Sequence, residues 1–95
     1  MTEQETPGTL EAMPVNARFD DDFITRVTMI LPTDTMREVA RKVAVPVVGR
    51  RVPDRDAGMV VRHHGSVLPA EMTVAEAGIK PFQSIFVGWT SEDSR

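Results

Sequence analysis

The 95-residue sequence predicts an α+β domain, in which a mixed sheet of four or five strands carries one main helix across one face. Residues 32–44 have the apolar spacing and the start signals of a short amphipathic helix. Strand patterns precede this helix and follow it in the sequence. Because a helix this short is not stable alone in water, the strands must provide the surface that buries its apolar stripe.

The composition describes one small domain and excludes several functions. We expect residues 1–12 to be a flexible tail, residues 13–90 to form the domain and residues 91–95 to fray. A net charge of −3 argues against a general nucleic-acid binder, and the lack of cysteine excludes disulfides, thiol nucleophiles and iron–sulfur ligation. Because the sequence shows neither a membrane span nor a signal-peptide pattern, we expect a cytoplasmic protein.

The first two strands are expected to form a hairpin. Residues 14–19 alternate apolar and polar side chains, and residues 23–31 predict the second strand. Asp20–Asp22 between them indicates a turn, in which we expect the carboxylates to be solvated. The second strand has large apolar residues on both faces, with Ile24 and Ile30 opposite the others. Either a bulge or burial of the second face by another protein would explain that pattern. The apolar side chains of the first strand are Val15, Ala17 and Phe19.

The predicted helix has well-defined ends. Thr35 and Glu38 have the spacing of a capping box, in which each side chain accepts a hydrogen bond from the other residue's backbone N–H. Asp34 adds negative charge at the positive end of the helix dipole. Pro46 cannot continue the helix, so we expect the helix to end or kink just before it. The side chains of the apolar stripe are Met36, Val39, Ala40 and Val43.

The second half of the chain predicts three more strands and a helical turn. Residues 59–64 and 66–68 indicate a third strand and a brief fourth one. Thr73 and Glu76 form a second potential capping box, which marks a single helical turn. Residues 84–89 predict the last strand. Periodicity alone does not decide which strands are parallel.

No arrangement of residues in the sequence points to catalysis. Neighbouring residues on a strand point to opposite faces, so we expect His63 and His64 not to share a metal ion. Hydrolase motifs, glycine-rich phosphate loops and a nucleophile beside a base are all missing. We therefore expect no catalytic, metal-binding or cofactor-binding residue in this chain.

The strongest functional pattern is a basic cluster near the middle of the chain. The cluster consists of Arg50, Arg51 and Arg55, with Arg62 nearby in sequence. These arginines could be solvated and meet Asp54 and Asp56 locally, they could pair with carboxylates on a partner protein, or they could bind phosphate. Trp89 could be a core residue or an interface anchor. We expect partner contacts, if present, to come from Arg50, Arg51 and Arg55 by charge and from Phe23, Ile24 and Trp89 by apolar contact.

Two segments of the chain resemble a ubiquitin-like β-grasp domain. The first is Pro32-Thr33-Asp34-Thr35-Met36 leading into the helix, and the second is Met72-Thr73-Val74-Ala75-Glu76-Ala77-Gly78-Ile79 before the last strand. The resemblance extends over residues 14–89 and implies that the helix crosses one face of the mixed sheet.

A narrower resemblance involves the basic cluster. The chain is similar to the gamma subunit, or system protein B, of toluene- and alkene-type bacterial di-iron monooxygenases, which hydroxylate aromatic or alkene hydrocarbons. This similarity rests on Arg50-Arg51-Val52, Arg55, Met59, Val61, Arg62, His64 and residues 72–78.

The resemblance implies a non-catalytic subunit that supports assembly with a catalytic alpha subunit. The di-iron centre is expected in that alpha subunit, and alpha, beta and gamma chains are expected to form a dimer of heterotrimers. A free-standing ubiquitin-like regulatory or protein-interaction module is the alternative. A covalent modifier is disfavoured because Gly88 is followed by Trp89 and the chain lacks a terminal Gly-Gly.

Overall fold

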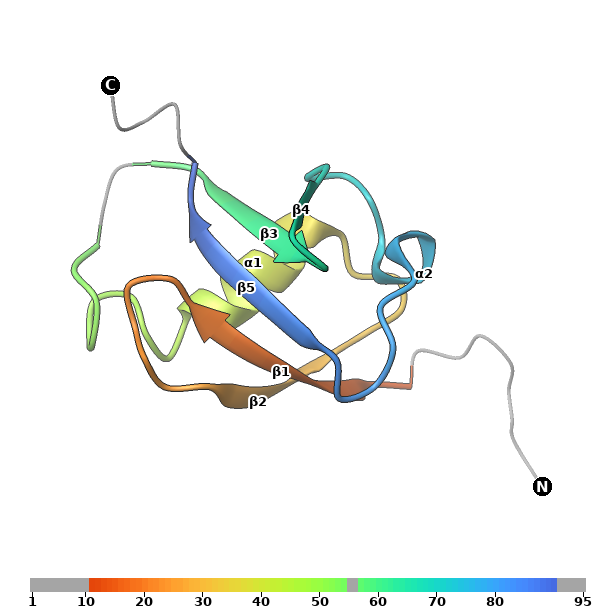
Figure 1. Cartoon of the computed structure of the whole chain (residues 1–95), viewed down its shortest axis with the longest axis horizontal. Coiled ribbons are helices and arrows are strands. Elements are labelled where there is room, and N and C mark those ends of the chain that lie inside the picture. Colours follow the sequence, from red (N-terminus) through yellow and green to blue (C-terminus); the bar gives the residue numbers. More distant parts are fainter. Residues whose placement is uncertain (1–10, 55–56, 91–95) are drawn as a thin grey trace.

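A five-stranded mixed sheet with a nine-residue helix on one face forms the body of the molecule (Figure 1). This arrangement, seen in the computed structural model of the chain, confirms the predicted α+β class. The strands are β1 (Met13–Phe19), β2 (Arg26–Ile30), β3 (Met59–His63), β4 (Ser66–Leu68) and β5 (Ser84–Trp89), and the helices are α1 (Met36–Ala44) and α2 (Val74–Ala77).

The structure describes residues 11–54 and 57–90. Most of the expected tail, the expected frayed end and Arg55 of the basic cluster lie outside the described residues. Neither helix in the described ranges is long and apolar enough to cross a membrane.

The strands lie in the order β2-β1-β5-β3-β4, and only the central pair, β1 and β5, is parallel among the strand pairs described. β1 pairs with β2 without a shift in register from Met13 opposite Ile30 to Ala17 opposite Arg26, so the paired region of the hairpin contains no bulge. The predicted second strand began three residues too early, because the chain from Phe23 to Thr25 is outside the ladder.

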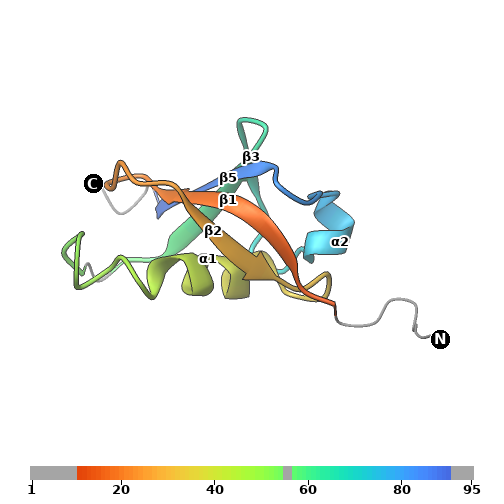
Figure 2. The same ribbon diagram turned by 90° about the horizontal axis from the view of Figure 1, so that it is seen from below.

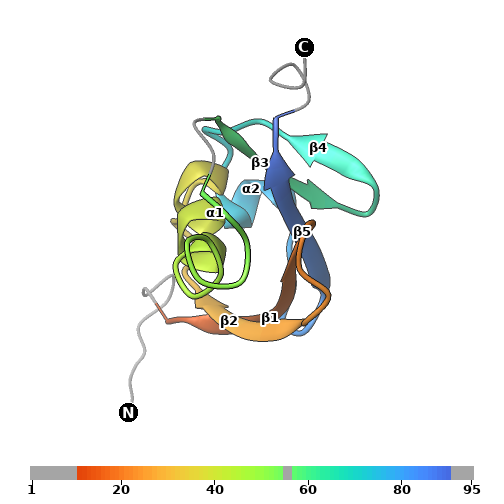
Figure 3. The ribbon, with the colours of Figure 1, turned by 90° about the vertical axis from the view of Figure 1, so that its left-hand side faces the viewer.

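The core lies between α1 and the sheet, and the opposite face of the sheet is covered by no element of the described chain (Figures 2 and 3). All side chains of the predicted helix stripe are buried, which confirms that prediction. Alternation along β2 sends Ile30 into this core and leaves Val27 and Met29 exposed on the other face. The largest fully buried side chains include Phe19, Ile30, Met36, Val39, Ile85 and Val87.

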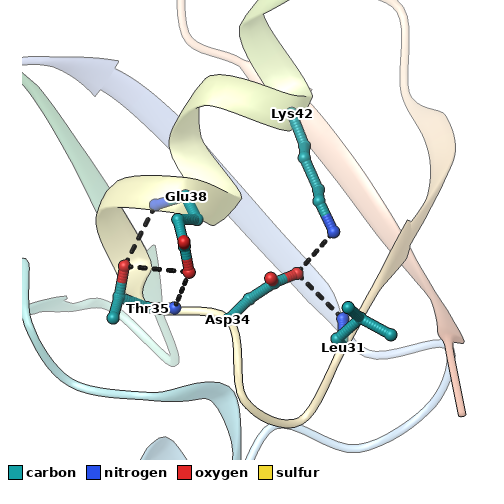
Figure 4. Close-up of polar contacts among 5 residues, drawn as sticks. All are labelled: Leu31, Asp34, Thr35, Glu38 and Lys42. Atoms are coloured by element: carbon teal, nitrogen blue, oxygen red, sulfur yellow. Dashed lines mark hydrogen bonds and ion pairs between the residues drawn. The ribbon is translucent and has the colours of Figure 1, made fainter. Parts of the chain in front are cut away.

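The start of α1 has the predicted capping box (Figure 4). The backbone N–H of Thr35 donates to Glu38 Oε1 at 2.9 Å, and the backbone N–H of Glu38 donates to Thr35 Oγ1 at 3.3 Å. Asp34 is buried, and its Oδ2 accepts from the Leu31 N–H at 2.9 Å and from Lys42 Nζ at 2.6 Å. Asp34 therefore fixes the chain between β2 and α1 as well as lying near the helix start.

The two helices are joined to each other where they begin. The N–H of Met36 donates to the carbonyl of Met72 at 2.8 Å, and the N–H of Val74 donates to the carbonyl of Asp34 at 2.8 Å. Thr73 and Glu76 form the second predicted capping box, and Gly78 ends α2 with a left-handed φ of 74°. The polar backbone groups at both helix starts are thus satisfied inside the fold.

Candidate interaction surface

The turn between β1 and β2 carries a buried carboxylate rather than three solvated ones. The Asp22 side chain is 2% exposed and accepts hydrogen bonds from the Phe23 N–H at 2.8 Å and from Arg51 Nε at 3.0 Å. The expectation that all three aspartates are solvated is therefore wrong. The Asp22 carboxylate can be buried because Arg51, which comes from the loop after α1, pairs with it.

Burial pushes the pKa of the Asp22 carboxyl upward, but the surrounding donors outweigh it. The hydrogen bond from Arg51, the backbone N–H groups of Phe23 and Ile24, and the positive charge of Arg51 together hold the pKa below its ordinary value. Asp22 is therefore ionised at neutral pH, and Arg51 is held beside it.

The residues that follow α1 explain how Arg51 reaches this turn. The helix ends at Ala44, just before Pro46 as predicted, and the buried Val47 anchors the chain that follows. The Val47 carbonyl accepts from the N–H of Arg51 at 2.8 Å, and Gly49 takes a left-handed φ of 83°. This tight loop turns Arg51 back toward the β1–β2 turn.

Arg51 also lies against the most exposed large apolar side chain described. Phe23 is 82% exposed, and the Arg51 guanidinium carbon is 5.7 Å from its ring centroid. Ile24 beside it is half-buried, and Arg50 is exposed with no ion pair within the described chain. We name Asp22, Phe23, Ile24, Arg50 and Arg51 the Phe23 corner.

The remaining predicted contact residues are placed differently. Trp89 is half-buried and packs edge-on against Phe19, with ring centroids 5.3 Å apart and planes at 71°. Arg55 lies outside the described residues. The structure thus brings Phe23 and Arg51 together, whereas Trp89 contributes to the core.

A second group of polar and aromatic side chains lies on the uncovered face of the sheet. Arg18, Phe86 and Arg62 are opposite one another on the adjacent strands β1, β5 and β3. The Arg18 guanidinium carbon is 5.3 Å from the Phe86 ring centroid, and Arg62 forms an ion pair with Asp20. Sequence reasoning did not identify this group, because the pairing of β1 with β5 was not predictable from periodicity. The one signal in the sequence was the alternation along β1, which places Arg18 on the face opposite to that of the buried Ala17 and Phe19.

The histidine pair does not have the predicted geometry. His63 is buried and its Nε2 is 2.9 Å from Gln83 Oε1, whereas His64 is exposed. Their rings stack 3.9 Å apart instead of pointing to opposite faces, because His64 leaves the strand with a φ of 54°. Within residues 11–54 and 57–90, no three His, Asp or Glu side chains gather in a way that could hold a metal ion.

The charged residues on the helix side of the molecule are mostly paired. Arg37 pairs with Glu71, and Lys42 pairs with Asp34. Arg41 is exposed on the same helix and has no ion pair within the described chain. Arg41 is therefore an isolated arginine on the side of the molecule opposite Arg18, and it can serve as a control for Arg18.

Comparisons of sequence point to one family. The family model described as toluene-4-monooxygenase system protein B (TmoB) matches residues 12–89. The chain is 41% identical over 80 residues to the gamma subunit of the toluene-4-monooxygenase hydroxylase component from Ectopseudomonas mendocina, a match covering 82% of this chain and 95% of that protein. It is also 39% identical over 44 residues to the gamma subunit of the alkene monooxygenase oxygenase component from Xanthobacter autotrophicus strain Py2, covering 46% of this chain and 50% of that protein.

Comparisons of structure agree with the sequence matches. A chain of the toluene 4-monooxygenase HD complex with the inhibitor 4-bromobenzoate matches with a TM-score of 0.80 and 40% identity, covering 84% of this chain and 100% of that one. Ubiquitin from Caldiarchaeum subterraneum matches with a TM-score of 0.66 at 15% identity, covering 85% and 96% of the two chains. The second match shows that the fold is ubiquitin-like, as the helix and capping segments predicted.

Proposed function

Because the chain belongs to the toluene-4-monooxygenase system protein B family, we propose that it is the gamma subunit of a monooxygenase hydroxylase component. Its role there is non-catalytic and supports assembly with the catalytic alpha subunit. The observation that carries this proposal is a 41% identical match that spans 95% of a hydroxylase gamma subunit. The substrates of the complex are proposed to be aromatic or alkene hydrocarbons, as the names of the matched systems suggest.

The chemistry is proposed to take place in the alpha subunit, which would hold a di-iron centre. Alpha, beta and gamma chains would form a dimer of heterotrimers in the cytoplasm. The described part of this chain supports a non-catalytic role in one respect: its buried carboxylates, Asp22 and Asp34, are both engaged by internal donors. Those side chains stabilise the fold and are not free to bind a metal or a substrate.

The Phe23 corner is the proposed site of contact with the hydroxylase. Phe23 presents a large aromatic surface, and aromatic residues are frequent interface anchors. Arg51 is proposed to position Phe23, since its guanidinium is already held by Asp22, while Arg50 is available to pair with a carboxylate on the partner. Ile24 adds apolar area next to Phe23. Contacts by Arg55 and Trp89 stay predictions.

Co-expression of this chain with the other hydroxylase subunits tests the proposal. Native mass spectrometry of the purified complex is expected to show one copy of this chain for each alpha chain, with all iron retained when this chain is removed. A chain that is purified alone in the presence of those subunits would contradict the proposal. Reversible binding of less than one copy would favour the alternative of a free-standing regulatory module.

Phe23→Ala tests the proposed contact within that complex. We expect the substitution to weaken binding by about 2 kcal/mol, a value typical of an aromatic anchor at an interface. Because Phe23 is 82% exposed, the fold should be unaffected, which circular dichroism can check. Val45→Ala is the control, since Val45 is 67% exposed at the end of α1 and does not belong to the Phe23 corner. Equal dissociation constants for the Phe23 variant and the wild-type chain would remove this corner from the interface.

A further inference from the structure

The uncovered face of the sheet combines an unpaired cation with exposed apolar side chains. We name Arg18, Val27, Met29, Arg62 and Phe86 the open face, because they alternate with residues directed toward α1. Val27 is 61% exposed and Met29 is 51% exposed. Figure 2 shows that α1 lies on one side of the sheet, which is the side of the core and not of these residues.

Arg18 is the residue on this face whose charge is not neutralised within the described chain. The Asp20 carboxylate lies over Gly88, where a side chain would collide with it, and is paired with Arg62. Arg18 has no ion pair within the described chain, and its Nε is shielded from solvent without a hydrogen-bond partner. Its guanidinium carbon instead lies 5.3 Å from the ring centroid of Phe86. A positioned arginine fork without an anion is suited to bidentate pairing with a carboxylate.

The area that a stable complex requires also points to this face. A specific interface buries about 800 Å² on each partner. Phe23 can contribute only about 200 Å² of this area, so the Phe23 corner alone is too small. Asp20, which pairs with Arg62 on the open face, and Asp22, which anchors the Phe23 corner, belong to the same turn. The open face and the Phe23 corner therefore meet at the β1–β2 turn.

We propose that the open face docks onto a surface of the hydroxylase that presents an Asp or Glu carboxylate to Arg18, surrounded by apolar side chains that cover Val27 and Met29. This inference rests on the proposed function, because it names the hydroxylase as the partner. Removal of water from around Arg18 on docking strengthens its attraction to the carboxylate, and the neighbouring apolar side chains provide that exclusion.

Arg18→Met tests the ion pair, because it removes the charge and keeps a flexible apolar stem on Phe86. We expect the dissociation constant for the hydroxylase to rise at least about tenfold at low salt. The wild-type affinity should fall as NaCl is raised, and the Arg18 variant should show a flatter salt dependence. Arg41→Met is the matched control, since Arg41 is an exposed arginine on the helix side of the molecule, and its affinity should stay near that of the wild-type chain.

Hydroxyl-radical footprinting of the wild-type complex provides a second test that needs no variant. Met29 and Phe86 should be strongly protected in the complex relative to the free chain, whereas Val45 at the end of α1 should be labelled equally in both. Wild-type binding with unchanged labelling of Met29 and Phe86 would overturn the open-face proposal and leave the proposed function intact. A homodimer of this chain that Arg18→Met abolishes, without any change in hydroxylase binding, would also overturn it.

Discussion

Asp22 shows how one residue connects stability with the proposed contact. Its side chain is buried in the β1–β2 turn, yet it is charged because Arg51 and two backbone N–H groups stabilise the ionised form. The same arginine lies on the Phe23 ring. An ionised Asp22 therefore holds the cation that lies beside the most exposed aromatic side chain of the described chain.

This arrangement predicts a specific dependence of stability on pH. The pKa of Asp22 is lower in the folded chain than in the unfolded chain, where it is about 3.9. The ionised carboxylate therefore favours folding above about pH 4, and this contribution is lost as the pH falls toward the lower pKa of the folded chain. Asp22→Asn should decrease the free energy of unfolding at neutral pH and flatten its decline in acid, as measured by urea denaturation at several pH values.

Asp21 provides the control for that measurement, because it is an exposed carboxylate in the same turn. Asp21→Asn should leave the free energy of unfolding close to that of the wild-type chain at each pH. If the Asp21 and Asp22 variants had the same pH profile, the ion pair with Arg51 would not be the source of the stabilisation.

At the scale of elements, backbone hydrogen bonds between the two capped segments tie the starts of α1 and α2 together. The N–H groups of Met36 and Val74 each donate to a carbonyl that belongs to the chain preceding the other helix. Loss of one cap should therefore affect the start of both helices. The four-residue α2 depends especially on this contact, since a helix of one turn cannot persist alone.

Thr35→Ala tests the capping box of α1. It removes the acceptor for the Glu38 N–H, and we expect it to lower the free energy of unfolding by about 1 kcal/mol. Thr33→Ala is a suitable control, because Thr33 is exposed and lies two residues before the cap. Thermal denaturation followed by circular dichroism measures both. Equal stability of the Thr35 variant and the wild-type chain would show that solvent replaces the cap at no cost.

The helices could be predicted from the sequence because their signals are local. Thr35 with Glu38 and Thr73 with Glu76 define both helix starts within a few residues, and Pro46 defines one end. The parallel pairing of β1 with β5 joins residues about 70 positions apart, as in Asn16 opposite Ser84, and no local pattern encodes it.

The candidate surface could be predicted only in part, for the same physical reason. Phe23 and Arg51 were identified from their residue types, but their contact depends on a loop and a turn that are distant in sequence. Asp22 was misjudged because turn aspartates are usually solvated, and its burial requires Arg51. Arg18 was missed because its partner ring, Phe86, is on the strand that pairs with β1 only in the folded sheet.

At the scale of the whole molecule, the fold has one covered face and one uncovered face (Figure 3). The covered face contains the core. The uncovered face and the adjoining Phe23 corner contain Phe23, Val27 and Met29, three of the six large apolar side chains that the described chain leaves exposed. This division of roles is expected of a subunit that folds through one face and binds through the other.

The extent of the core also predicts which part of the chain is needed for folding. Its buried side chains within the described ranges run from Val15 to Val87, and every strand and helix lies between Met13 and Trp89. A chain shortened to residues 11–90 retains all of these contacts, so its midpoint of thermal unfolding should stay within about 4 °C of the full-length value, which corresponds to about 1 kcal/mol. It should also bind the hydroxylase in the same stoichiometry, because both proposed contact surfaces are retained.

As a control, a chain that starts at Asp20 loses β1 from the centre of the sheet and should not fold. A large loss of stability in the 11–90 chain would contradict the proposed domain boundary, whereas normal stability with loss of binding would place an essential contact outside the Phe23 corner and the open face.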